Sequence, residues 1–127
     1  MTSRAMLAAA TVALVGAGPL AAQLPVGNAA TGQRVFVQCK TCHVTTPGVN
    51  RIGPSLAGIV GRKSGTVPKY MYSAANKASG FVWTEAKLSQ YLEAPRKFMP
   101  GTKMSFAGLK KPQDRADVIA WLKTQKG

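Results

Sequence analysis

The sequence is short of the residues from which metal sites and sheets are built. Its 127 residues include only two cysteines and one histidine, so a structural zinc site would have to borrow carboxylates from four acidic side chains. No run of alternating apolar and polar residues predicts a β-strand, and no segment is repeated. These absences argue against a sheet-based or repeat architecture, and the length fits one domain. We therefore expect a single all-α domain.

The sequence also lacks an apolar run long enough to span a membrane. The nearest candidate is the N-terminal segment, in which Arg4 precedes an apolar stretch over 5–14, followed by the small pair Ala21–Ala22. A spanning helix needs about 20 apolar residues, and two glycines and a proline interrupt this segment. A retained membrane anchor is the alternative. We predict a cleaved secretory signal peptide over 1–22 and a mature domain over 23–127.

Negative charge is the third scarcity. The predicted mature chain has 16 Lys and Arg against 4 Asp and Glu, a net charge of +12. Such a charge points to anionic partners. Nucleic acid is the usual guess for a basic protein, but export argues against it. We expect an acidic protein surface, or an anionic membrane surface contacted at its periphery.

Three segments have the spacing of amphipathic helices. The first runs from about Asn28, a plausible N-cap, to Cys39. The second is capped by Thr84 and stops at Pro95, because proline interrupts helices. The third opens at Pro112, a favoured first helical residue.

A long segment rich in glycine and proline separates the first two helices, from residue 43 to about 81. A structureless loop of this length is unusual in so small a domain. Three helices also bury little core of their own. Both observations are explained if the loop wraps a large, rigid, apolar ligand.

Both cysteines and the histidine lie in CKTCH, residues 39–43. A redox dithiol is expected at a strand–helix junction, and no strand is predicted here. A disulfide between Cys39 and Cys42 would close a very small loop, stabilise little, and leave His43 unexplained. Cys-x-x-Cys-His is the pattern of c-type haem attachment. In that interpretation, which we favour, the two thiols add across the haem vinyl groups and His43 is the proximal iron ligand.

The residue on the far side of the iron decides the function. With no second histidine, the choice is methionine, lysine or an open position. We assign Met71 and Met99 to core packing and Met104 to the iron, because PGTKM forms a tight turn that directs a side chain inward. Methionine–histidine ligation raises the reduction potential and suits electron transfer. An open position would suit gas binding or peroxide reduction.

Several stretches together make the chain resemble a class I c-type cytochrome, of the mitochondrial cytochrome c or bacterial cytochrome c-two type. They are CKTCH, GPSLAGIVGRKSG, YMYSAANK, GFVWTEAKLSQYLEAP, PGTKMSFAGLKK and RADVIAWLK. The resemblance covers nearly the whole mature domain. It implies the small cytochrome c fold, with about three main helices and Gly/Pro-rich loops wrapped around a covalently bound haem.

The resemblance also implies roles for individual residues. Cys39 and Cys42 would carry the haem, His43 and Met104 would bind its iron, and the Pro54 carbonyl would orient the His43 ring. The residues implied to lie near the haem propionates are Arg62, Tyr72, Trp83 and Thr102. Those implied to adjust the Met104 side through hydrogen bonds are Asn76 and Tyr91. Those implied to join the first and last helices are Gly32, Phe36 and Trp121.

The expected activity is one-electron transfer in a bacterial periplasm by a monomer that is not an enzyme. The resemblance implies a quinol–cytochrome c reductase complex as donor and a terminal oxidase or photosynthetic reaction centre as acceptor. A small haem peroxidase, a gas-binding protein and a dedicated electron acceptor of a periplasmic dehydrogenase are the alternatives. The basic residues expected to dock acidic partners around the haem edge are Lys40, Arg96, Lys97, Lys103, Lys110 and Lys111.

Overall fold

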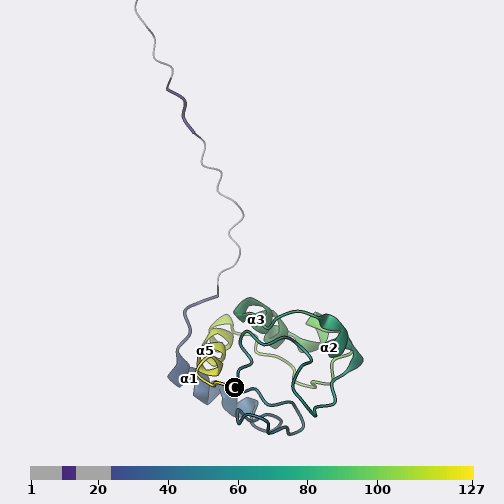
Figure 1. Ribbon diagram of the computed structural model, residues 1–127. Coiled ribbons are helices and arrows are strands. Elements are labelled where there is room, and N and C mark those ends of the chain that lie inside the picture. Colours follow the sequence, from purple (N-terminus) through teal and green to yellow (C-terminus); the bar gives the residue numbers. More distant parts are fainter. Residues whose placement is uncertain (1–9, 14–23) are drawn as a thin grey trace, which may run out of the picture.

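A computed structural model of the chain (Figure 1) describes residues 10–13 and 24–127. The predicted signal peptide over 1–22 lies outside the described residues except for 10–13, so it stays a prediction. In the described ranges, no helix combines the length and the apolar character that crossing a membrane requires.

The described part of the chain is helical, as expected, and its only β-pairing is an isolated bridge between Lys63 and Val82. Long connections join the helices and form the side of the molecule away from α1 and α5 (Figure 1). The helical elements are α1 (Ala29–Val35), the 3-10 turn η1 (Phe36–Gln38), α2 (Ala74–Ser79), α3 (Glu85–Glu93), α4 (Pro95–Phe98) and α5 (Pro112–Leu122).

The three predicted helices begin where their capping residues predict. The Asn28 side chain accepts a hydrogen bond from the Thr31 backbone N–H at 2.9 Å, and Thr84 caps α3 in the same way. Each cap satisfies a backbone donor that the helix itself leaves unpaired. Pro112 is the first residue of α5, where its missing N–H costs nothing.

Two short helices were not predicted. The segment expected to be loop over 43–81 contains α2, which Ser73 caps by accepting a hydrogen bond from the Asn76 N–H at 3.1 Å. Gly80 ends α2 in a left-handed conformation, with φ 65°. Pro95 ends α3 as expected, but it also begins α4, because proline fits the first turn of a helix.

The first and last helices cross in direct contact (Figure 1). Gly32 makes this approach possible, because a Cβ at that position would clash with the Asp117 carbonyl of α5. The Phe36 ring then packs against Trp121, with ring centroids 4.5 Å apart. The predicted contact between these helices is confirmed.

The two methionines assigned to the core have different environments. Met99 is 5% exposed and belongs to the core cluster, as predicted. The prediction for Met71 is wrong, because its side chain is 77% exposed. Its neighbours Tyr70 and Tyr72 both line the central cavity. Successive side chains of an extended segment point to opposite sides, so Met71 is directed to solvent.

Candidate haem-binding site

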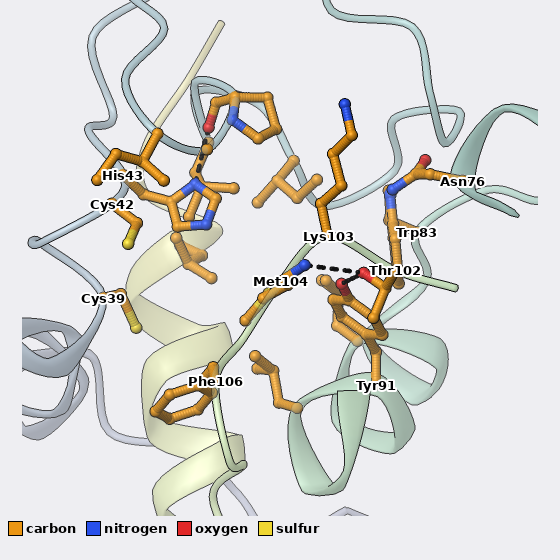
Figure 2. A pocket seen from close by; sticks show the side chains of 18 of the residues that line it. Cys39, Cys42, His43, Asn76, Trp83, Tyr91, Thr102, Lys103, Met104 and Phe106 are labelled. Atoms are coloured by element: carbon orange, nitrogen blue, oxygen red, sulfur yellow. Dashed lines mark hydrogen bonds between the residues drawn. The ribbon is translucent and has the colours of Figure 1, made fainter. Parts of the chain in front are cut away.

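A cavity of about 360 Å³ lies between the helices and the long connections. Cys39, Cys42 and His43 enter it from one side, directly after η1, and Met104 enters from the other, on the connection between α4 and α5 (Figure 2). The apolar side chains that complete its wall are Phe36, Leu56, Ile59, Leu88, Leu92, Phe106, Val118 and Leu122. A large apolar group is what such a wall would hold.

A tight backbone turn brings the motif residues to one side of the cavity. The N–H groups of Cys42 and His43 both donate to the Cys39 carbonyl, at 3.1 and 2.9 Å. Both thiols are free and half-buried. Burial, together with the nearby Cys42, raises the pKa of the Cys39 thiol from 9.0 to about 11. The Cys39 thiol is thus held in protonated form, and both cysteines line the cavity, where they could add to the two vinyl groups of a haem.

The His43 ring is fixed on two sides. Its Nδ1 lies 2.8 Å from the Pro54 carbonyl oxygen and donates to it in the neutral tautomer. A Cβ at Gly53 would clash with the ring, so glycine makes room for the imidazole. Burial lowers the pKa of His43, although the Pro54 contact opposes this. The neutral ring therefore presents Nε2, the nitrogen directed into the cavity in Figure 2, as a lone-pair donor.

The Met104 turn is tied to α3 through one hydroxyl group. The Thr102 Oγ1 accepts from the Met104 backbone N–H at 3.2 Å and lies 2.8 Å from the Tyr91 hydroxyl (Figure 2). Burial raises the pKa of Tyr91, partly opposed by the Thr102 hydrogen bond. Tyr91 therefore stays a neutral hydrogen-bonding partner, and the half-buried Met104 is held at the cavity.

Two polar atoms in the cavity wall show what else a ligand must supply. In the described part of the chain, the buried side-chain nitrogen or oxygen atoms without a partner are Nε of Arg62 and Oδ1 of Asn76. The Arg62 Nη1 does have partners, because it donates hydrogen bonds to the Ser55 and Ala57 carbonyls. A buried donor without a partner costs about 1–3 kcal/mol. A ligand with an apolar body and an anionic edge, such as haem with its propionates, would supply an acceptor for the Arg62 Nε–H, whereas the Asn76 Oδ1 requires a donor.

The cavity brings together every residue expected around the haem. Tyr72 and Trp83 are 8% and 5% exposed, and the Trp83 ring packs on Tyr91 with centroids 5.0 Å apart. The Tyr72 hydroxyl accepts from the Val67 N–H at 3.0 Å. The predicted residues found in the lining are Cys39, Cys42, His43, Pro54, Arg62, Tyr72, Asn76, Trp83, Tyr91, Thr102 and Met104.

The predicted docking residues surround this region less closely. All six are exposed, but only Lys103 lines the cavity. Arg96 and Lys97 instead line a second hollow with Phe106. The Lys110 Nζ already makes hydrogen bonds within the chain, because it donates to the Glu93 and Ala107 carbonyls.

Sequence reasoning missed some residues of the site. Gly53 and Phe106 were not singled out as site residues, nor were Tyr70 and Ser73, and all four line the cavity. Gly53 had a usable signal, because a Gly-Pro pair ten residues after the haem motif marks a fixed backbone bend. Phe106 carried none, since one aromatic in a connection has no periodicity to place it.

A small helical fold around a cavity with a Cys-x-x-Cys-His motif and an opposing methionine defines a c-type haem protein. The family model of cytochrome c matches residues 29–126. The chain is 57% identical over 105 residues to a cytochrome c from Trypanosoma brucei brucei, covering 83% of this chain and 99% of that protein. It is 49% identical over 119 residues to cytochrome c2 of Rhodomicrobium vannielii, covering 91% and 95%.

Among solved structures, cytochrome cH from Methylobacterium extorquens matches with a TM-score of 0.74 and 45% identity, covering 77% of this chain and 99% of that one. The chain belongs to the cytochrome c family. It carries covalently attached haem c and acts in electron transfer rather than as an enzyme.

Proposed function

We propose that this chain is a diffusible one-electron carrier of a bacterial periplasm. It would take electrons from a quinol–cytochrome c reductase complex and deliver them to a terminal oxidase or a photosynthetic reaction centre. The observation that carries the proposal is the approach of His43 and Met104 from opposite sides of one cavity (Figure 2). If both side chains bound the iron of a haem held there, they would leave no position for a substrate, which favours electron transfer over catalysis.

The chain's own contribution is a rigid setting. The haem, when bound, supplies a one-electron change at its iron. Pro54 orients the His43 ring, and Thr102 holds the backbone of Met104. Both ligands therefore keep their places whichever charge the centre carries, and little rearrangement accompanies transfer. Arg62 Nε offers a buried donor to the anionic edge.

The charge of the surface supports acidic redox complexes as partners. The chain has 17 basic residues against 4 acidic ones, and the six predicted docking residues are exposed. Opposite charges speed the encounter of two proteins. Salt weakens this effect, because it screens charges that lie farther apart than the Debye length, about 8 Å at physiological ionic strength. A transient, salt-sensitive complex suits a carrier that must release its partner quickly.

The periplasmic location rests on the predicted signal peptide over 1–22 and on the bacterial cytochrome c2 and cytochrome cH that the chain resembles. The cytochrome c from Trypanosoma brucei brucei, a eukaryote, is more similar in sequence, at 57% identity. Fractionation of a bacterium that expresses the full gene tests the location, with mass spectrometry of the purified protein to find its first residue. A protein recovered from the cytoplasm with residues 1–22 intact would contradict it.

One optical experiment tests the carrier function. The spectrum of the reduced holoprotein is recorded before and after addition of carbon monoxide. We expect no change, because Met104 occupies the position that the gas would need. A shifted Soret band would instead favour the gas-binding or peroxidase alternative.

A second experiment tests the partner class. Oxidation of the reduced protein by a purified cytochrome c oxidase is followed by stopped flow at rising salt concentration, and the rate should fall as the salt concentration rises.

A further inference from the structure

Two serine hydroxyls meet where the connection before α2 crosses the end of that helix. Ser64 Oγ lies 2.6 Å from Ser79 Oγ, and Ser79 Oγ donates to the Asn76 carbonyl at 2.6 Å. Because Ser79 uses its one hydroxyl proton in the second bond, the Ser64 hydroxyl donates in the first. Ser64 is 4% exposed, Ser79 is half-buried, and neither lines the haem cavity. We call these two residues the serine pair.

The serine pair joins the two segments that carry the polar wall of the cavity. Ser64 comes two residues after Arg62, and Ser79 comes three residues after Asn76 on α2. Arg62 and Asn76 both line the cavity. The Arg62 Nε is buried without a partner, and the Asn76 amide turns its nitrogen toward the cavity in Figure 2. These two nitrogens are the donors that an anionic edge of a ligand would meet.

Each of the two segments is rigid by itself. The Ser64 N–H donates to the Phe81 carbonyl at 2.8 Å, and the Trp83 N–H donates to the Arg62 carbonyl at 2.8 Å. Residues 62–64 are thereby fastened to residues 81–83. On the other side, α2 is a regular helix with its own cap. Since neither segment bends freely, the placement of Arg62 relative to Asn76 depends on the contacts between the segments.

The serine pair and one glycine close the seam between these segments. A Cβ at Gly65 would lie 3.3 Å from both the Asn76 carbonyl oxygen and the Lys77 Cα, and its φ of 70° also favours glycine. Glycine therefore lets the connection approach α2 closely. Among the hydrogen bonds of the described residues, the contact between the two serines is the one that joins residues 61–66 to α2.

We propose that Ser64 and Ser79 are positioning residues for electron transfer, because they hold the Arg62 and Asn76 donors together around the anionic edge of the haem and keep water out of the seam behind them. Water stabilises a charge better than a protein interior does, and the ferric centre carries one more positive charge than the ferrous centre. Burial and hydrogen bonding near a haem set its reduction potential. A closed seam, with the Arg62 cation held in place, therefore keeps the reduction potential high.

The test is a redox titration of the purified holoprotein and of its Ser64→Ala/Ser79→Ala variant. We expect the reduction potential of the variant to fall, so that the ratio of ferrous to ferric protein at the wild-type midpoint drops about threefold, within the range of one hydrogen bond. Removal of both partners leaves no buried hydroxyl unpaired, so the variant should fold. The iron–sulfur charge-transfer absorption should persist, because the contacts of the Met104 turn involve neither serine.

Three single substitutions make the result specific. Ser64→Ala breaks the same contact but leaves Ser79 bonded to Asn76, so it should lower the potential as the double variant does, and it replaces that variant if the double variant does not fold. Ser79→Thr keeps a hydroxyl and should retain the wild-type potential. Thr66→Ala is the matched control, because the Thr66 hydroxyl lies on the same connection but donates to the Lys63 carbonyl and does not reach α2.

A double-mutant cycle shows whether the serine pair acts through Arg62. In an Arg62→Gln protein the guanidinium is already lost, so Ser64→Ala should lower the potential by less than it does in the wild type. An equal drop in both proteins would mean that the serines do not place Arg62, and would overturn the inference.

Other outcomes also count against the serine pair. A wild-type potential in both Ser64→Ala and the double variant would reduce the two serines to packing. An equal drop in Thr66→Ala would show that the contact with α2 is not the cause. A drop accompanied by loss of the charge-transfer absorption would place the effect at the iron ligand instead. None of these measurements involves a redox partner, so failure of the proposed donor or acceptor would leave the inference standing, and its own failure would leave them standing.

Discussion

The hydroxyl of Tyr91 on α3 lies 2.8 Å from that of Thr102, two residues before Met104. Thr102 in turn accepts from the Met104 N–H at 3.2 Å. These contacts connect the buried face of α3 to the turn that presents the proposed iron ligand. The position of Met104 is therefore set by α3 as well as by its own turn.

Tyr91→Phe tests this connection. The ring still fills its buried site, but Thr102 loses its hydroxyl partner, which should lower the free energy of unfolding by about 1 kcal/mol. The Met104 turn should loosen, and the iron–sulfur charge-transfer absorption should disappear at a lower temperature. Thermal scans of this band and of far-ultraviolet circular dichroism measure the two effects. If the variant lost the charge-transfer band and the circular dichroism signal at the same temperature as the wild type, the contact between Tyr91 and Thr102 would not hold the Met104 turn.

Replacement of the proposed iron ligand gives a second prediction. Met104→Leu keeps the volume but removes the thioether, so the charge-transfer absorption should vanish. The reduction potential should fall by on the order of 0.1 V, because a thioether favours ferrous iron and axial ligands set the potential. Redox titration of the purified protein measures the shift.

Met99→Leu is the matched control for this ligand prediction. Met99 is buried at 5% exposure and does not line the cavity. A volume-conserving swap in the core should cost less than about 1.5 kcal/mol and leave the potential near the wild-type value. If Met99→Leu abolished the absorption and Met104→Leu did not, the ligand would have been misassigned.

The crossing of α1 and α5 gives a third prediction. Gly32→Ala places a Cβ against the Asp117 carbonyl, so the helices must separate and the packing of Phe36 on Trp121 must loosen. We expect a loss of about 3 kcal/mol in the free energy of unfolding, measured by denaturant titration. Gly48→Ala is the control, since no atom lies within 4 Å of its Cβ position and only its φ of 73° opposes the change. An equal loss in both variants would mean that contact with α5 is not the cause.

The sequence predicts best where a local rule decides the structure. Asn28, Thr84 and Pro112 mark helix starts because their preferences do not depend on distant residues. Short helices such as α2 and α4, of six and four residues, are too brief to show a hydrophobic period.

The residues of the candidate site likewise divide into those that a local pattern identifies and those that only the fold brings into place. CKTCH has a spacing that the chemistry of attachment imposes, so it can be recognised without the fold. Met71 was misplaced because residue type alone does not show which way an extended segment faces.

Lys69 has φ 62° in the turn after Pro68, and this strained position gives the last prediction. Lys69→Gly should raise the free energy of unfolding by about 1 kcal/mol, because relief of the left-handed strain exceeds the extra entropy that glycine adds to the unfolded chain. Lys69→Ala removes the same charge but keeps the strain, so it should give no such gain. Denaturant titration of the three proteins measures these differences. If glycine and alanine were equally stabilising, loss of charge in this basic protein would be the cause.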